Sequence, residues 1–156
     1  MIFDEIDLRI LEVLQREGRI SNQELADQIG LSPSPCLRRL KRLEESGVIR
    51  QYVALVDSLK VGLGLLAYVS VKLEKRGEGA VKAFARAVQN WQEVVACYSM
   101  TGDLDYLLRV HVEDLEHYSR FVMNSLLKHP GITEVKSSFA LERVKDTTAL
   151  PLAHLV

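Results

Sequence analysis

Residues 32–47 read SPSPCLRRLKRLEESG, a stretch with a proline-marked beginning, a basic centre and a glycine at its end. The first turn of a helix contains backbone N–H groups that have no helical partner, so Pro33 and Pro35 fit there and preset φ. Ser32 is then the N-cap, and Gly47 is the kind of residue at which helices commonly stop. The stretch therefore predicts one short helix with four basic side chains in its middle.

The predicted helix has two unlike faces. With about 3.6 residues per turn, Cys36, Leu40 and Leu43 share an apolar face that can pack on neighbouring helices. Leu37 lies at the margin of this face, whereas the opposite face is polar and basic. Arginines there can either pair with guanine edges or bind phosphates. The candidate DNA-contacting residues are Ser32, Ser34, Pro35, Arg38, Arg39, Lys41 and Arg42.

Two more helices are predicted before this one. An apolar stripe indicates a helix over residues 4–17 that Gly18 ends. A second begins at Ser21, because the sequence S-N-Q-E lets the Ser21 hydroxyl and the Glu24 carboxylate form a capping box, and Gly30 ends it. Three helices with a tight turn between the last two form a helix-turn-helix, whose third helix enters the major groove of DNA.

A charged helix face also has a simpler interpretation, which is a solvated surface. In that case the basic residues pair with Glu44 and Glu45 along the same helix. The helix-turn-helix pattern before the basic residues favours DNA binding instead. Because the whole chain carries a formal net charge of -1 and has a pI near 6.4, the attraction to DNA must come from this local patch.

The second half of the chain alternates between strand and helix patterns. The expected elements are a β-rich run over 48–56, a linker over 57–64, a strand over 66–73, a helix over 78–88, a hairpin within 93–112, a helix over 114–127 and a strand over 132–144. The order β-α-β-β-α-β predicts a ferredoxin-like domain and an α+β protein. We expect a helix-turn-helix domain at 1–52, a strand or linker at 53–64 and the βαββαβ domain at 65–156.

The residues S21-N-Q-E-L-A-D-Q-I-G, the following L-S-P-S-P-C-L-R-R-L-K-R-L-E-E-S-G-V-I-R and the later T-G-D-L-D-Y-L-L-R-V resemble the Lrp/AsnC (leucine-responsive, feast/famine) transcriptional regulators. The resemblance covers nearly the whole chain. It implies a homodimer, often assembled into an octamer, whose DNA binding or assembly responds to a small amino acid. The candidate sheet residues for dimerisation are Leu55, Leu65, Leu66, Tyr68, Tyr106 and Leu108.

The loop near Gly102 is the candidate effector site. A free amino acid needs acceptors for its ammonium group and donors for its carboxylate, and this loop offers carboxylates, a hydroxyl and an accessible backbone. The residues alone favour a plain type I′ turn over an effector site, whereas the resemblance implies an effector at this loop and at a subunit interface. The candidate residues are Met100, Thr101, Gly102, Asp103, Leu104 and Asp105, faced by Thr133, Val135, Ser137 and Ser138 of the last strand.

Aliphatic Leu104 and Met100 beside the loop favour leucine or methionine as the effector. We expect no cofactor and no metal, because Cys36 and Cys97 match no zinc spacing. The sequence shows neither a nucleophile–base set nor a phosphate loop, so we do not expect an enzyme. The sequence shows neither a membrane-spanning stretch nor a signal peptide, and we expect a cytoplasmic protein.

Two other functions share part of this pattern. An architectural protein that wraps DNA without an effector would need the same basic helix but would bind no amino acid. A regulatory amino-acid-binding module would use its N-terminal half for protein contacts and would not bind DNA.

Overall fold

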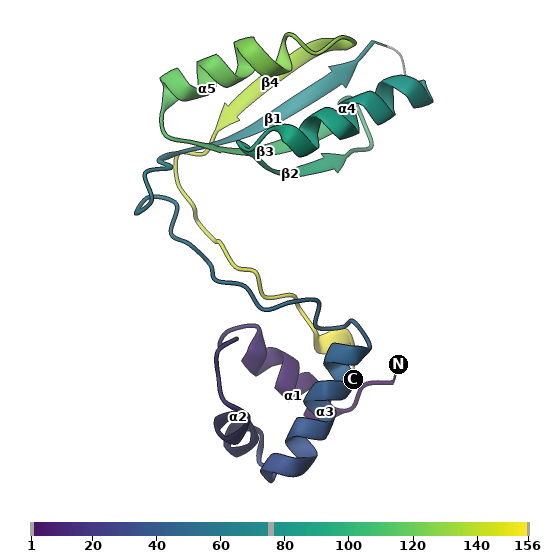
Figure 1. Cartoon of the computed structure of the whole chain (residues 1–156), viewed down its shortest axis with the longest axis vertical. Coiled ribbons are helices and arrows are strands. Elements are labelled where there is room, and N and C mark those ends of the chain that lie inside the picture. The colour runs from purple at the N-terminus through teal and green to yellow at the C-terminus, as the bar shows by residue number, and fades with distance from the viewer. Residues whose placement is uncertain (1, 75–76, 156) are drawn as a thin grey trace. The chain divides into compact units, whose positions relative to one another are not determined.

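The structure is a computed structural model that describes residues 2–74 and 77–155. The chain divides into two compact units. The first contains the residues up to Leu55 together with those from Lys145 onward, and the second is Val56–Val144. The elements of both are labelled in Figure 1.

The first unit is the predicted three-helix arrangement. Its helices are α1 (Glu5–Leu14), α2 (Asn22–Ile29) and α3 (Pro33–Glu45) (Figure 1). Their contacts bury a small core that contains Ile10, Leu25, Cys36 and Leu43, none of them more than 1% exposed. The predicted apolar face of α3 therefore packs on the other two helices, and the basic residues are left at its surface.

The predicted helix ends are confirmed for α2 and α3. Ser21 caps α2 through the capping box with Glu24, and Gly30 ends it at φ +74°. Pro33 opens α3, and Gly47 follows its end at φ +78°. The predicted end of α1 was wrong by three residues. The helix was expected to continue to residue 17, but it ends at Leu14 and is followed by a turn.

The β-rich run over 48–56 forms no strand within the described chain. A strand needs a partner to accept and donate its ladder of hydrogen bonds, and no strand of the described residues pairs with this segment. Ile49 packs against the helical core, but the later apolar side chains of the segment stay exposed, with Leu55 at 73% and Val56 at 69%. Strand-like composition here marks an extended connection.

The C-terminal residues from Lys145 onward belong to the first unit, whereas the sequence placed them with the βαββαβ domain. Two hydrogen bonds join Gln15 to the backbone of Leu150: Gln15 Nε2 donates to the Leu150 carbonyl at 3.2 Å, and the Leu150 amide donates to Gln15 Oε1 at 2.6 Å. Leu152 packs against the helical core. The segment with Leu150 and Leu152 is thus docked on the helix-turn-helix.

The second unit has the predicted βαββαβ order and an antiparallel four-stranded sheet. Its elements are β1 (Leu65–Leu73), α4 (Glu78–Asn90), β2 (Val94–Ser99), β3 (Tyr106–Val112), α5 (Leu115–Phe121), the π-helical turn η1 (Val122–Leu126) and β4 (Ile132–Phe139). The strand order is β2-β3-β1-β4. Both helices cover one face of the sheet, and none of the described residues of this unit forms a helix on the other face (Figure 1).

Alternation along the strands decides which side chains meet the helices. Val69 of β1 and Leu108 of β3 are opposite each other in the register and are fully buried under Phe84 and Val88 of α4. The alternate residues face away, as Tyr68 does. Ala67, Val69, Val71 and Leu73 share the buried face of β1.

Several details of this unit differ from expectation. The apolar residues of α4 do not all lie in the core: Phe84 and Val88 are buried, whereas Val81 and Ala85 are exposed. The last strand ends at Phe139. Of the residues expected on a dimerising sheet face, Leu65, Tyr106 and Leu108 pack against the helices, so only Leu66 and Tyr68 lie on the open face.

No helix in the described ranges is long and apolar enough to cross a membrane.

Candidate DNA-binding surface and amino-acid site

The outer face of α3 carries the exposed side chains Ser34, Arg38 and Lys41. Arg38 and Lys41 are three residues apart, so they lie almost in line along the helix. Neither forms an ion pair or a hydrogen bond with its side chain to any residue that the structure describes. Both charges are therefore available to a ligand.

Arg39 and Arg42 are engaged differently. The Arg39 Nη1 donates to Asp4 Oδ2 at 2.7 Å and to Asp7 Oδ1 at 3.0 Å. Arg42 Nη2 pairs with the other oxygen of the Asp7 carboxylate. Both aspartates belong to the beginning of α1, where Asp4 is the N-cap. Two of the four basic side chains of α3 therefore hold the first helix.

The electrostatics agree with this pairing. The pKa of Asp4 is lowered by the hydrogen bond from the Asp7 amide and by the Arg39 guanidinium. The pKa of Arg39 is raised, first by its hydrogen bond to Asp4. The alternative pairing with Glu44 and Glu45 is absent from the described chain, and Glu44 instead accepts a hydrogen bond from the Tyr52 hydroxyl at 2.8 Å.

The remaining predicted residues of this surface lie at the beginning of α3. Ser32 is its N-cap, although its side chain makes no capping hydrogen bond. Pro35 is half-buried within the first turn, and the carbonyl of Pro33 accepts a hydrogen bond from Asn22 of α2 at 2.9 Å. The tight turn between α2 and α3 is thus fixed by a contact that leaves Ser34 outward.

In the second unit, the loop from Met100 to Asp105 joins β2 to β3. The Met100 amide donates to the Asp105 carbonyl at 2.9 Å, which closes the loop. Gly102 has φ +98°, whereas no non-glycine residue of the described chain has a positive φ. A type I′ turn at Gly102-Asp103 requires positive φ at both residues, so that interpretation was wrong.

Asp105 joins the loop to β1 through two hydrogen bonds. Its carboxylate accepts a hydrogen bond from the Leu73 amide at 2.8 Å, and its own amide donates to the Val71 carbonyl at 3.0 Å. Asp103, by contrast, is exposed and accepts no hydrogen bond from any described residue. The two aspartates of the motif therefore have different roles.

A recess of about 500 Å³ opens on the helix side of this loop. Such a volume lies within the range of about 300–1,000 Å³ that is typical of small-molecule sites. Apolar side chains form one part of its wall and polar groups the other. The lining residues are Leu73, Val81, Ser99, Met100, Thr101, Gly102, Asp105 and Tyr106.

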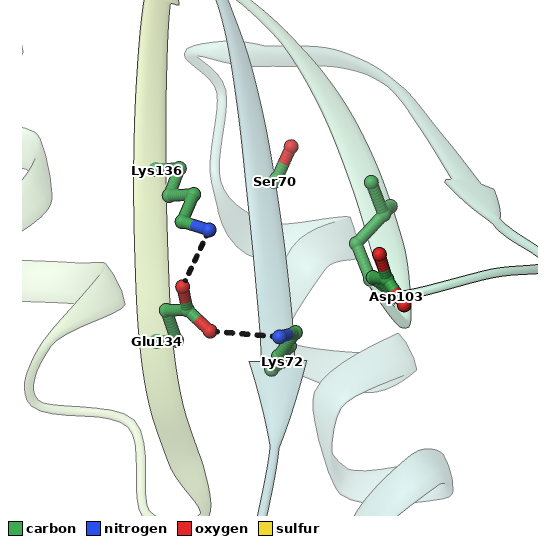
Figure 2. Close-up of a pocket in the computed structure, with 6 residues that line it drawn as sticks. Ser70, Lys72, Asp103, Glu134 and Lys136 are labelled. Carbon is green, nitrogen blue, oxygen red and sulfur yellow. Dashed lines mark ion pairs between the residues drawn. The ribbon is translucent and has the colours of Figure 1, made fainter.

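A second recess, of about 80 Å³, lies on the open face of the sheet, and Figure 2 shows its polar lining. Lys72 of β1 pairs with Glu134 of β4 at 3.0 Å, and Glu134 also pairs with Lys136 at 2.8 Å. Asp103 and Ser70 complete the labelled set (Figure 2). The pKa of Lys136 is raised, chiefly by its hydrogen bond to Glu134 and to a lesser degree by the charge of Asp103.

Both halves of the chain match models of known protein families. A model of the Lrp/AsnC ligand binding domain matches residues 66–150, and a model of winged helix-turn-helix DNA-binding domains matches residues 3–50. The chain belongs to the Lrp/AsnC family. It is a DNA-binding transcriptional regulator with an amino-acid-binding domain, and regulators of this kind are not enzymes.

Individual relatives agree with the family assignment. The chain is 40% identical over 151 residues to the DNA-binding transcriptional activator DecR of Escherichia coli, covering 97% of this chain and 99% of DecR. It is 39% identical over 147 residues to the leucine-responsive regulatory protein of Escherichia coli, covering 94% and 90%.

Solved structures show the same fold. A complex of the transcriptional regulator NMB0573 from Neisseria meningitidis with L-Met has a TM-score of 0.96 at 46% identity, covering 99% of both chains. An AsnC family regulator from Agrobacterium tumefaciens has a TM-score of 0.93 at 40% identity, covering 99% of this chain and 100% of that one.

The sequence candidates for the effector site include four residues of β4, and the structure places these four away from both recesses. Val135 and Ser137 of β4 face the helices, where Ser137 hydrogen-bonds to Tyr118, and Thr133 hydrogen-bonds to the Lys72 carbonyl at 3.4 Å. Ser138 is opposite Tyr68 on the open face. None of these four residues of β4 lines either recess.

The alternate residues Glu134 and Lys136 line the smaller recess instead. A shift of one residue exchanges the two faces of a strand, and the mixed polar pattern of β4 gave no signal for the correct face. Leu73, Val81 and Tyr106 of the larger recess were also missed. Their apolar character indicated core packing alone.

Proposed function

We propose that this Lrp/AsnC protein is a sequence-specific regulator whose α3 contacts DNA and whose DNA binding or assembly responds to methionine or leucine. The observation that carries the proposal is the exposed row of Ser34, Arg38 and Lys41 on the third helix of a helix-turn-helix, whose two cations form no ion pair with any described residue. The major groove admits a helix of this kind, with its N-terminal residues nearest the bases.

The roles of the contacts follow from their chemistry. Arg38 has the forked guanidinium that recognises the O6 and N7 atoms of guanine, whereas Lys41 presents a point charge suited to phosphate. Ser34, at the beginning of the helix, is placed to meet a base edge, and Ser32 and Pro35 are positioned beside it. Arg38 then contributes to sequence preference and Lys41 mainly to affinity.

For the effector, we propose the larger recess. Leu73, Val81 and Met100 offer an apolar wall for an aliphatic or thioether side chain. Thr101 and the backbone at Gly102 offer polar groups for the ammonium and carboxylate. The L-Met in the 46% identical neighbour supports methionine for this chain.

The experiment is a thermal-shift panel of the twenty amino acids on the full chain, with and without DNA. A ligand at about 100 times its Kd stabilises the folded protein by about 2.7 kcal/mol. We expect methionine or leucine to raise the melting temperature and charged amino acids to leave it unchanged. A panel without any stabiliser would contradict the effector proposal and favour an architectural DNA-binding protein.

A matched pair of variants locates the amino acid. Thr101→Val alters the polar part of the larger recess and should reduce the thermal shift by the effector. Ser70→Ala alters the smaller recess on the other face of the sheet and should leave it unchanged. If Ser70→Ala reduces the thermal shift and Thr101→Val does not, the effector binds in the smaller recess on the open face of the sheet.

Coupling between the two sites is reciprocal, so an effector that changes DNA affinity must have its own affinity changed by the same factor when DNA is present. The DNA-containing arm of the panel measures this directly. An equal shift in both arms would show an effector that acts on something other than DNA affinity, such as assembly.

We also infer that the working unit is a homodimer, with an octamer as the larger assembly. In support, Tyr68 and Tyr98 are exposed on the sheet face opposite to α4 and α5. A dimer would present two copies of α3 to half-sites about 34–36 Å apart. Light scattering after size exclusion tests the assembly. Because the proposed target is chromosomal DNA, we place the protein in the cytoplasm.

A further inference from the structure

We infer that Asp7 is a positioning residue for DNA recognition: its buried carboxylate occupies Arg39 and Arg42, so that only Arg38 and Lys41 of the basic residues of α3 remain for DNA. This inference rests on the proposed contact between α3 and DNA. It divides a basic cluster that looks uniform in sequence into a structural pair and a DNA-facing pair.

Both oxygens of the Asp7 carboxylate accept hydrogen bonds. Its side chain is 1% exposed, and its two oxygens accept from different arginines, Oδ1 from Arg39 at 3.0 Å and Oδ2 from Arg42. The Oδ2 atom also accepts from the Asp4 amide at 3.3 Å, as part of the capping box of α1. The two arginine interactions join the beginning of α1 to the middle of α3, and the bond from the Asp4 amide holds the carboxylate within its own helix.

Helix geometry explains why the two pairs separate. Residues three apart lie nearly in line along a helix, so Arg38 and Lys41 form one row and Arg39 and Arg42 another. One residue corresponds to about 100° of rotation in a helix with 3.6 residues per turn. The second row is therefore turned from the first, and it meets α1, where Asp7 is located.

The pairing should persist when DNA is bound. Removing a partner from a buried carboxylate leaves an unpaired charge in a poorly hydrated site, which is strongly unfavourable. A phosphate that attracted Arg42 would have to compensate for that loss. The exposed Arg38 and Lys41 have no such partner and can move to DNA without it.

A functional consequence follows for specificity. Phosphate contacts supply affinity that does not depend on sequence. By withholding two long cationic side chains, Asp7 limits such contacts and holds α3 at a fixed orientation on α1. A chain without this carboxylate should bind unrelated DNA more tightly and distinguish its own site less well.

The test measures the salt dependence of DNA binding by the full chain, on a site selected from a random duplex pool and on an unrelated duplex. The logarithm of the binding constant falls with the logarithm of salt concentration by about 0.9 for each phosphate contact. We expect Lys41→Ala to make this slope shallower without changing the melting temperature. Arg42→Ala should lower the melting temperature and leave the slope unchanged.

Asp7→Asn supplies the complementary measurement, with Glu12→Gln as its control. Both changes remove one negative charge from α1, but Glu12 is exposed and its carboxylate has no partner in the described chain. We expect Asp7→Asn to steepen the slope on unrelated DNA and reduce the ratio of specific to unrelated binding. Glu12→Gln should leave both near the parent values.

Arginine reactivity tests the same point without substitutions, in case a variant does not fold. Phenylglyoxal labelling of the parent chain, read by mass spectrometry, should modify Arg38 faster than Arg39 or Arg42. DNA should then protect Arg38 most strongly.

The outcomes distinguish the positioning role of Asp7 from the DNA-binding role of α3. If Arg42→Ala reduces the salt slope as much as Lys41→Ala does, Arg42 reaches phosphate and the positioning role of Asp7 is refuted, while α3 remains the DNA-binding helix. If neither Arg38→Ala nor Lys41→Ala alters binding, the proposed DNA surface itself is wrong and this inference falls with it.

Discussion

The Asp105 carboxylate accepts a hydrogen bond from the backbone amide of Leu73 at 2.8 Å, and so fastens the loop after β2 to the end of β1. In the sequence, Asp103 and Asp105 look equivalent as acceptors for an ammonium group. In the fold, only Asp103 is exposed and accepts no hydrogen bond from a described residue. Asp105 shapes the loop that lines the larger recess.

Asp105→Ala should therefore destabilise the second unit. A hydrogen bond to a charged group contributes about 1.5–3 kcal/mol to stability, and the Leu73 amide would lose its acceptor. We expect a fall of that order in the free energy of unfolding in urea, together with weaker effector binding. Asp103→Ala is the control and should leave stability nearly unchanged; equal losses in both variants would contradict the structural role of Asp105.

Ser21→Ala tests the cap of α2. The Ser21 hydroxyl accepts a hydrogen bond from the Glu24 amide at 3.2 Å, and loss of such a cap costs about 1 kcal/mol. Ser32→Ala is a matched control, because Ser32 is the N-cap of α3 but makes no capping hydrogen bond with its side chain. Thermal unfolding of the two variants should show a clear decrease for the first and a small one for the second.

Acid should weaken the first unit through Asp4 and Glu24. The Asp7 amide and Arg39 lower the pKa of Asp4 below its ordinary 3.8, and Ser21 lowers the pKa of Glu24 below 4.5. A carboxyl group with a lowered pKa in the folded state stabilises the fold above its unfolded pKa, and this contribution is lost as pH falls through the folded pKa.

The stability of the helix-turn-helix should thus be constant from neutral pH to about pH 5 and decrease below that. Urea unfolding between pH 7 and pH 3 measures this dependence. Glu24→Gln should make the acid decrease shallower, because it removes a carboxyl group whose pKa is lowered in the folded state. An unchanged pH profile in this variant would argue against the contribution of Glu24.

Gln15→Ala should release the C-terminal tail from the helix-turn-helix. The variant loses both hydrogen bonds to the backbone of Leu150, while Leu152 keeps its apolar contacts. We expect faster proteolytic cleavage near Leu150, with nearly unchanged cleavage elsewhere. Gln23→Ala, which removes an exposed side chain that hydrogen-bonds only to Asp27 in the described chain, should show the parent pattern.

Local chemistry explains which parts of the fold could be predicted from sequence. The beginning of α2 depends on Ser21 and Glu24, three residues apart, and the beginning of α3 depends on Pro33. The alternation in β1 placed Val69 on the buried face because side chains on a strand have a period of two. Such signals lie within one turn or one strand of the residues that they affect.

The candidate site was predictable only in part, for a related reason. The loop around Gly102 carries its own turn signal, whereas its neighbours on β4 and α4 are brought near it by the sheet register and by helix packing. A strand with polar residues on both faces, such as β4, has no pattern that selects one face. Glu134 and Lys136 were therefore missed.

The sequence by itself determined the helix-turn-helix, the βαββαβ order and the family, because caps, periodicity and short motifs act between residues close in the chain. Only the tertiary structure decided that Arg39 and Arg42 pair with Asp7, that the Asp105 carboxylate accepts a hydrogen bond from Leu73, and that Gln15 hydrogen-bonds to Leu150. Each of these pairs joins residues more than 30 positions apart. Charge and hydrogen-bonding capacity are visible in a sequence, but the partner that uses them is chosen by the packing of distant elements.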